Sequence, residues 1–224
     1  MPRVVGKSLK LTIDAGLRGK CPSLKLAVVT GAVHVTRSSE ALIAALNARA
    51  EEIAKIPEAA SHPEILATRN AYKKLGKEPS RYRGSAEALV RRVLAGKGLY
   101  FINNLVDINN LISLESFLPL GSYDLAKIEG HVVFRVGNSG ETYKGIGKDL
   151  INVADLPVFA DDKGAFGSPT SDSERAMITE STTQFAMVLI AFSGGVELER
   201  TAQHAMELIS WHANGKGLEI RTGE

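Results

Sequence analysis

The spacing of apolar residues changes near residue 118, and this change constrains the fold more than any other feature of the sequence. Before that point apolar side chains recur every three or four residues, which is typical of helices, and after it they alternate or form short runs, which is typical of strands. No period of 20 to 50 residues repeats, and no low-complexity linker divides the chain. We therefore predict one α+β domain over residues 1–224, with helices mainly in the N-terminal part.

Residues before 118 contain the signals of two strands and four helices. Both strands alternate apolar and polar residues, and we interpret them as edge or half-buried strands. Pro119 and Gly121 are expected to end the last of the helices. The predicted strands span residues 9–13 and 24–35, and the predicted helices span residues 39–56, 61–76, 85–96 and 104–117.

Residues after 118 favour strands over 131–136, 142–147 and 185–192, and the stretch 157–167 is predicted to be a strand that ends in a turn at residues 161–164. A last helix is predicted to end near residue 214. The apolar run from Phe185 to Phe192 is far shorter than the ~20 residues that a bilayer span needs, and the N-terminus lacks the apolar core of a signal peptide. A soluble, cytoplasmic protein is expected. Cys21 is the only cysteine, so no internal disulfide can form.

Basic residues gather between Arg69 and Lys97. This segment holds nine Lys and Arg and two Glu, a net charge of +7, whereas the rest of the chain holds 18 basic and 23 acidic residues, a net charge of −5. A basic segment on an acidic body can attract a polyanion, with nucleic acid the commonest candidate, although such runs more often form solvated helix faces. Charge alone leaves both interpretations open.

The loop between the second and third predicted helices is rich in arginine. Arg81 and Arg83 flank Tyr82, and guanidinium and aromatic groups of this kind grip phosphates and stack bases in RNA sites. The alternative is a surface turn pinned by Pro79. The predicted RNA-binding residues are Arg81, Tyr82, Arg83, Arg91 and Arg92.

Several kinds of catalytic machinery are excluded by their motifs. The sequence has no phosphate-binding lysine loop after a strand, no nucleophile elbow, no dinucleotide fingerprint and no set of Cys and His ligands. His204 and Glu207 resemble half of a carboxylate-histidine metal pair, but the other half is missing. We therefore expect neither a metal nor a cofactor.

Two clusters of polar residues remain as candidate sites. One, within the 104–117 helix, consists of Asp107, Asn109, Asn110 and Ser113, and the other is the run from Ser168 to Arg175. Asn and Asp are poor interior helix residues, so three of them together indicate a helix start, a site, or both. The second run is also what a solvated loop contains. These residue types can hold a small polar ligand and orient a water, but they include no strong nucleophile.

Four short motifs, in order over about a hundred residues, resemble the B3/B4 domain of the bacterial phenylalanyl-tRNA synthetase beta subunit. They are Val-Asp-Ile-Asn-Asn at 106–110, Pro-Leu-Gly-Ser-Tyr-Asp at 119–124, the 135–141 hairpin with Arg135 and Glu141, and the 161–167 turn that ends at Gly167. The resemblance is strongest from about Ser85 to Ala191. It implies a B3/B4-like single domain, with residues 1–84 as N-terminal strands and helices and residues 85–214 as the core.

The resemblance also implies a function, because the family domain hydrolyses tyrosine wrongly esterified to phenylalanine tRNA. An aminoacyl ester is already activated, so such a site can position a water and stabilise the oxyanion without a nucleophile. Gly121 stands where the family has histidine, Asn109 stands where it has threonine, and its pocket glutamate falls near Val188. By this resemblance Asn109 and Asn110 are the catalytic candidates, and the candidate pocket residues are Asp107, Ser113, Gly121, Arg135, Gly167, Ser168, Ser171, Asp172, Ser173 and Arg175.

Three functional hypotheses follow. The first is a free-standing protein that binds aminoacyl-tRNA and hydrolyses mischarged forms in trans, which cannot be a ligase because the catalytic modules of the synthetase have no counterpart. The second is a catalytically silent RNA-binding module. The third is an amino-acid or small-molecule binding protein that uses the same pocket.

Overall fold

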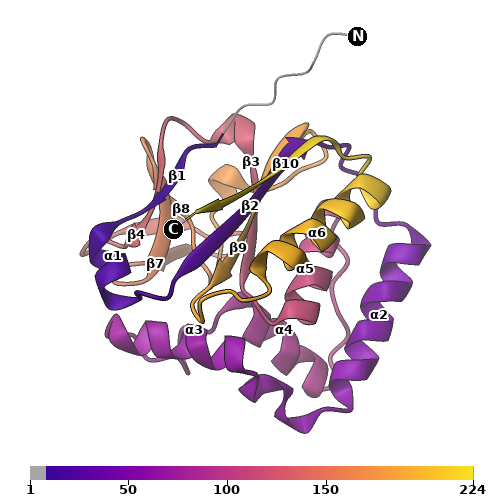
Figure 1. Ribbon diagram of the computed structural model, residues 1–224, viewed down its shortest axis with the longest axis horizontal. Coiled ribbons are helices and arrows are strands. Elements are labelled where there is room, and N and C mark those ends of the chain that lie inside the picture. Colours follow the sequence, from indigo (N-terminus) through magenta and orange to yellow (C-terminus); the bar gives the residue numbers. More distant parts are fainter. Residues whose placement is uncertain (1–8, 224) are drawn as a thin grey trace.

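The computed structural model describes residues 9–223 and consists of a four-stranded sheet between a layer of helices and a second sheet (Figure 1). The α-helices are α1 (Ala15–Lys20), α2 (Glu40–Ala54), α3 (Pro63–Lys74), α4 (Ser85–Leu94), α5 (Asn104–Ser116) and α6 (Leu198–His212). The strands are β1 (Leu11–Ile13), β2 (Lys25–Ala32), β3 (Leu120–Asp124), β4 (Val132–Val136), β5 (Thr142–Lys144), β6 (Leu150–Asn152), β7 (Pro157–Asp161), β8 (Gly164–Gly167), β9 (Gln184–Ala191) and β10 (Lys216–Gly223).

The central sheet has the antiparallel strand order β10-β2-β9-β3. β9 lies inside it, and every residue of β9 after Gln184 is buried, which explains the uninterrupted apolar run in the sequence. The prediction that the 24–35 strand is an edge or half-buried strand is wrong. β2 is paired on both sides, and Leu26 to Val29 are buried because both of its faces are covered.

The two faces of the central sheet bury two separate cores. Along β9, Phe185, Met187 and Leu189 face α2, α4, α5 and α6, whereas Ala186 and Val188 face the second sheet. Figure 1 shows α2, α5 and α6 on one side of β2, β9 and β10, and β1, β4, β7 and β8, together with α1, on the other. The period-2 alternation of strand side chains therefore separates a helical layer from a sheet layer.

The second sheet has the order β1-β4-β7-β8, with a parallel β1–β4 pair and antiparallel β4–β7 and β7–β8 pairs. A small β5–β6 pair packs on its outer side, where Tyr72 of α3 and Tyr143 of β5 join Val158 of β7 in a third buried cluster. This arrangement places one end of α3 beside the β5–β6 hairpin.

Local sequence signals set the helix ends that matter for the site. The side chain of Asn103 caps α5 by accepting a hydrogen bond from the backbone of Val106, and Phe117 ends the helix in the left-handed region, with φ of 60°. Ser39 caps α2 in the same way as Asn103. The predicted helices are all present, and the chain folds as the predicted α+β class.

One helix and four strands were not predicted. The helix is α1, at residues 15–20. β3 occupies residues 120–124, where a break was expected, β6 is a three-residue strand, β8 follows the predicted turn, and β10 covers residues after the predicted end of the last helix. β3 and β10 are the two edges of the central sheet. Over residues 9–223, no helix combines the length and apolar character needed to cross a bilayer.

Candidate functional site

The polar residues of α5 point in different directions. Asp107 is fully buried, and its carboxylate accepts hydrogen bonds from the Ser38 hydroxyl at 2.5 Å and from the backbone N–H of Ile102 at 3.0 Å. Burial raises the pKa of Asp107, although these two hydrogen bonds partly offset the effect. Asp107 therefore fastens two loops to the start of α5.

Asn109, Asn110 and Ser113 do not gather at one point either. The side-chain oxygen of Asn109 accepts a hydrogen bond from the Ser122 hydroxyl of β3 at 2.9 Å. The buried Ser113 hydroxyl donates to the carbonyl oxygen of Leu118 at 2.7 Å, which closes the turn after the helix. Asn110 is partly exposed. The structure brings only Asn109 next to β3, the strand that carries Gly121.

Gly121 and Val188 are direct partners across the β3–β9 pair, and Tyr123 covers that position. A Cβ atom on Gly121 would overlap the phenol group of Tyr123, and so would one on Gly167 of β8. The Tyr123 ring thus lies between the two glycines, and it also packs edge-on against Phe166 at a centroid distance of 5.0 Å. The two sequence positions where a histidine and a glutamate were expected are neighbours, and Tyr123 fills the space beside them.

Hydroxyl groups gather around the loop from Ser168 to Asp172. The three tyrosines Tyr72, Tyr123 and Tyr143 reach this loop from α3, β3 and β5, and together with the loop they form what we call the hydroxyl cluster. The Tyr72 hydroxyl lies 2.7 Å from the Thr170 hydroxyl. The Tyr123 hydroxyl donates to the Asp172 carboxylate at 2.8 Å, and the Tyr143 hydroxyl donates to the Ser171 carbonyl oxygen at 2.5 Å. The loop from Ser168 to Asp172 is therefore held in place by these hydrogen bonds, whereas its composition alone was equally typical of a solvated loop.

Asp172 is the one carboxylate in the loop from Ser168 to Asp172. It accepts hydrogen bonds from the Tyr123 hydroxyl at 2.8 Å and from the backbone N–H of Ser168 at 3.3 Å, and no basic side chain among residues 9–223 pairs with it. Burial raises the pKa of Asp172 to about 7, although the two hydrogen bonds favour the ionised form. A carboxyl group that titrates near neutral pH can act as a general acid or base.

Arg135 and Arg175 each form a bidentate ion pair. Arg135 holds Glu141 at 2.7 and 2.8 Å, and the hydrogen bonds from Arg135 lower the pKa of Glu141. Arg175 holds Asp161 at 2.8 and 3.0 Å. Burial alone would raise the pKa of Asp161, but the hydrogen bonds that it accepts lower it overall. Both arginines fasten hairpin turns and lie outside the hydroxyl cluster.

Ser173 adjoins the cluster and is buried, and its hydroxyl has no hydrogen-bond partner among the described residues. Its backbone is fixed instead. The N–H of Ser173 donates to the carbonyl oxygen of Phe166, and the residue forms a bridge with Gly145.

The arginine-rich loop lies beside the hydroxyl cluster. The backbone N–H of Ser85, the first residue of α4, donates to the carbonyl oxygen of Pro169 at 2.7 Å, so the point where the arginine-rich loop enters α4 contacts the loop from Ser168 to Asp172. Arg81 and Arg83 are exposed, and neither forms an ion pair within residues 9–223. Tyr82 is half-buried and packs against the third buried cluster, which contains Tyr143. The Lys77 ammonium group lies 5.1 Å from the centre of the Tyr82 ring.

Arg91 and Arg92 have different surroundings from those two arginines. Arg91 shares the buried Glu87 carboxylate with Arg69, at 2.7 and 2.8 Å, which ties α4 to α3. The Arg92 guanidinium lies over the Tyr100 ring, 3.8 Å from its centre. The five predicted RNA-binding residues therefore fall at the two ends of α4.

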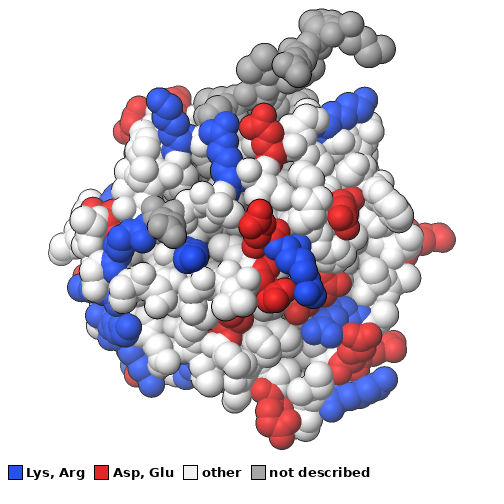
Figure 2. All heavy atoms as spheres, in the orientation of Figure 1, with Lys and Arg blue, Asp and Glu red and all other residues white. Residues whose placement is uncertain are grey.

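Exposed basic side chains continue from the arginine-rich loop onto neighbouring helix ends. Lys20 ends α1, and Lys73 and Lys74 end α3; all three are exposed, and none forms an ion pair in the described part of the chain. Figure 2 shows blue side chains along the edge where α1 and α3 lie, whereas both signs mix over α6. We call the residues Lys20, Lys73, Lys74, Arg81 and Arg83 the basic face.

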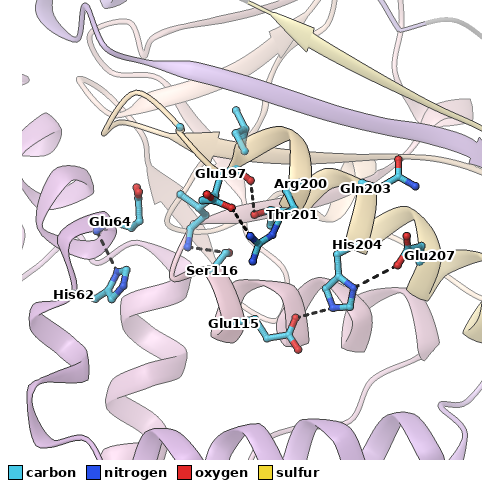
Figure 3. A pocket seen from close by; sticks show the side chains of 13 residues that line it. His62, Glu64, Glu115, Ser116, Glu197, Arg200, Thr201, Gln203, His204 and Glu207 are labelled. Atoms are coloured by element: carbon cyan, nitrogen blue, oxygen red, sulfur yellow. Dashed lines mark hydrogen bonds and ion pairs between the residues drawn. The ribbon is translucent and has the colours of Figure 1, made fainter.

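A cavity of about 860 Å³ lies elsewhere, between the starts of α3 and α6 and the end of α5 (Figure 3). His204 Nε2 is 3.1 Å from Glu115 in this cavity, and the hydroxyl groups of Ser116 and Thr201 donate to backbone carbonyl oxygens. No hydroxyl is therefore activated by the histidine. Within residues 9–223, no three His, Cys, Asp or Glu side chains are grouped so as to hold a metal ion.

A family model described as the B3/4 domain matches residues 67–210, which is more than half of the chain. The chain belongs to the B3/4 domain family. The matched range begins in α3 and ends in α6, so it contains the arginine-rich loop, the whole of α5, the β3–β9 pair and the hydroxyl cluster.

Two known proteins show similarity to this B3/4 chain. The phenylalanine–tRNA ligase beta subunit of Psychrobacter arcticus is 33% identical over 96 residues, which cover 42% of this chain and 12% of that protein. The chain thus matches about an eighth of that relative. A crystal structure of an N-terminal fragment of the phenylalanyl-tRNA synthetase beta subunit from Pyrococcus horikoshii aligns with 99% of this chain and 52% of that one, at 14% identity and a TM-score of 0.47.

The B3/4 assignment agrees with the four motifs, but two features of the site could not be read from them. The position of Tyr123 over Gly121 requires the β3 strand, which was not predicted. The contact between the arginine-rich loop and the loop from Ser168 to Asp172 joins residues more than eighty positions apart. Only Tyr123 gave a weak signal of the hydroxyl cluster in the sequence, because it stands in the 119–124 motif at the position where the family pattern has Phe.

Proposed function

We propose that this chain binds tRNA, with the basic face contacting phosphates and the loop from Ser168 to Asp172 facing the bound strand. The beta subunit that it resembles belongs to a tRNA ligase, which supports tRNA as the polyanion. Exposed lysines and arginines without ion-pair partners can neutralise phosphates at no cost in broken contacts.

One observation carries this proposal: the arginine-rich loop lies directly beside the hydroxyl cluster. The hydrogen bond from Ser85 to Pro169 places Arg81 and Arg83 next to a loop rich in hydroxyl groups. Lys148 adds another cation, because its ammonium group donates to the Ser171 hydroxyl at 3.2 Å. Cations and hydroxyl donors side by side are the groups that contact the phosphates and sugars of nucleic acids.

Hydrolysis by the family's own histidine and glutamate is not part of the proposal. Gly121 and Val188 occupy the two positions, and neither can donate, accept or transfer a proton through its side chain. The phenol group of Tyr123 fills the adjacent space and donates a hydrogen bond to Asp172. The main proposal is therefore tRNA binding without that pair of catalytic groups.

Trans hydrolysis of mischarged aminoacyl-tRNA is the second candidate, and Asp172 favours it. A carboxyl group with a pKa of about 7 can take a proton from an attacking water at neutral pH. In this candidate the water is held near Asp172 and the hydroxyl groups of Ser168 and Ser171. The predicted catalytic residues Asn109 and Asn110 take no part in it, because Asn109 bonds Ser122 on the helical side of β3, whereas Tyr123 and Asp172 lie on the other side.

Binding is tested with purified protein and fluorescently labelled unfractionated tRNA at low salt, measured by anisotropy. Wild type is expected to bind, and the double variant Arg81→Ala/Arg83→Ala is expected to bind at least about tenfold more weakly. Arg200→Ala is the control, because Arg200 is an exposed arginine of α6 that is not part of the basic face and that pairs with Glu197. Absence of binding by wild type would refute the proposal.

Hydrolysis is tested by the release of amino acid from a panel of mischarged tRNAs. If the second candidate is correct, release by wild type rises through pH 7 and Asp172→Asn removes it while leaving tRNA binding in place. Equal release with and without protein, across the panel, would leave binding as the only function.

A further inference from the structure

Three large apolar side chains in a row are exposed between α4 and α5. Tyr100 is 64% exposed, Phe101 43% and Ile102 61%. Most residues of this type are buried in the chain, and three consecutive exposed ones indicate an interaction site. We call residues 100–102 the aromatic ledge.

The aromatic ledge is held in place from both ends. Arg92 of α4 donates from Nε to the carbonyl oxygen of Gly98 at 2.6 Å, and its guanidinium stacks on the Tyr100 ring. At the other end, the backbone N–H of Ile102 donates to Asp107 at 3.0 Å. The exposure of these side chains is therefore a fixed feature of the surface.

Three basic side chains lie near the aromatic ledge. Arg92 lies against Tyr100, and Lys97 is exposed three residues before it. Arg37 is exposed next to Ser38, whose hydroxyl group hydrogen-bonds the same Asp107 carboxylate that holds Ile102. Neither Lys97 nor Arg37 forms an ion pair within residues 9–223, so both are available to a negatively charged partner.

We propose that the aromatic ledge binds unpaired nucleotides, with bases stacked on Tyr100 and Phe101 and phosphates contacted by Arg92, Lys97 and Arg37. Stacking between bases and aromatic rings, combined with nearby cations, is the general mode of single-strand recognition. Three consecutive residues make a narrow strip, which suits a strand of bases better than a protein partner that needs about 800 Å² on each side.

This inference rests on the proposed tRNA binding and places a second contact for the same RNA. Arg81 and Arg83 precede the first turn of α4 and Arg92 lies in its last turn, so the ten residues of the helix separate the two regions by about 15 Å. An RNA that contacts the basic face with its paired backbone can place an unpaired loop or end on the aromatic ledge.

The test uses the full chain and a single-stranded RNA oligonucleotide that contains 2-aminopurine, whose fluorescence is quenched when the base stacks. Wild type is expected to quench the probe. The double variant Tyr100→Ala/Phe101→Ala is expected to lose the quenching and to raise the Kd at least about tenfold. Trp211→Ala is the matched control, because Trp211 is an aromatic residue 86% exposed on α6 and removing it leaves the ledge intact.

A conservative variant, Tyr100→Phe/Phe101→Tyr, separates stacking from folding, because it keeps both rings and is expected to quench as wild type does. If wild type binds tRNA and Tyr100→Ala/Phe101→Ala binds the oligonucleotide with unchanged Kd and quenching, the ledge proposal is wrong and the tRNA proposal stands. If size-exclusion chromatography instead shows an oligomer that this double variant dissociates, with RNA binding unchanged, the ledge is a protein interface and the inference is overturned. Failure of wild type to bind any RNA refutes the proposed function itself.

Discussion

Tyr123 occupies a space that exists because two neighbouring residues have no side chain. Gly121 lies beside it on β3 and Gly167 lies beside it on β8, and a Cβ atom on either glycine would overlap the phenol group. The hydroxyl at the tip of the ring then reaches Asp172. One aromatic residue thus links the edge of the central sheet to the loop from Ser168 to Asp172.

Gly121→Ala is expected to lower the free energy of unfolding by about 1–3 kcal/mol, because overpacking forces the Tyr123 ring to move. In a Tyr123→Leu background the same substitution is expected to cost much less, since the smaller side chain leaves room. Urea unfolding of the four proteins measures this coupling. Gly19→Ala is the control, because Gly19 has open space around it in α1. Equal costs in the two backgrounds would contradict the packing described for Tyr123.

Asp172 is expected to make stability fall as the pH rises. Its pKa in the folded chain is about 7, above the ordinary value of 3.8, so the folded state binds more protons than the unfolded state between those values. The contribution is most favourable below pH 4 and is lost by about pH 7. Asp172→Asn removes the ionisation, so the variant is expected to gain roughly 1–3 kcal/mol on wild type between pH 5 and pH 8.

Urea unfolding at pH 5 and pH 8 measures this difference. Asp149→Asn serves as the control, because Asp149 is an exposed carboxylate between β5 and β6. A difference between wild type and Asp172→Asn that does not change with pH would show that Asp172 does not titrate in this range.

At the scale of elements, α5 is organised by polar residues with structural partners. Asp107 joins the loop before α2 to the loop before α5, and the amide group of Asn104 donates to the carbonyl oxygens of His34 and His212 at 2.9 Å. These side chains connect α5 to the end of β2 and to the end of α6. The polar cluster of α5, which suggested a site in the sequence, therefore serves in part to hold the start of this helix in place.

Asp107→Ala is expected to destabilise the chain by about 2–4 kcal/mol, because it removes a fully buried side chain and leaves both the Ser38 hydroxyl and the backbone N–H of Ile102 without their acceptor. Asn110→Ala, one turn along the same helix, is expected to change the stability by less than about 0.5 kcal/mol, since Asn110 is partly exposed. Thermal and urea unfolding compare the two variants. A loss of stability in Asn110→Ala as large as in Asp107→Ala would show that α5 is fastened differently.

Periodicity was enough to predict the helices α2 to α6 and the buried strand β9, because each of these buries one regular stripe or a continuous apolar run. It missed the six-residue helix α1, which buries only Leu17 and is too short to show a period. It missed β3 and β10, which are sheet edges and contain Gly121 and Gly217, residues that lower the strand signal. The four motifs predicted the family, whereas the hydroxyl cluster depends on Tyr72, Tyr123 and Tyr143, which lie far apart in the sequence and meet only through the packing of α3, β3 and β5.

At the scale of the whole molecule, the buried cores and the exposed cations of the basic face lie in different parts of the three-layer fold. The central sheet buries most of both faces through β2, β9 and β3, and the cations of the basic face lie along the edge formed by α1, α3 and the loop before α4. The net charge of the chain is only +2, so attraction to a polyanion depends on this local grouping. Removing two of its arginines leaves the cores untouched.

The dependence of tRNA affinity on salt tests the central claim most directly. Wild type and Arg81→Ala/Arg83→Ala are each titrated with unfractionated tRNA between about 50 and 200 mM salt, and log K is plotted against log salt concentration. A negative slope is expected for wild type, and a slope smaller in magnitude by roughly 1–2 is expected for the double variant, because two phosphate contacts are lost. Identical slopes for the two proteins, or no binding by wild type at the lowest salt, would contradict the account.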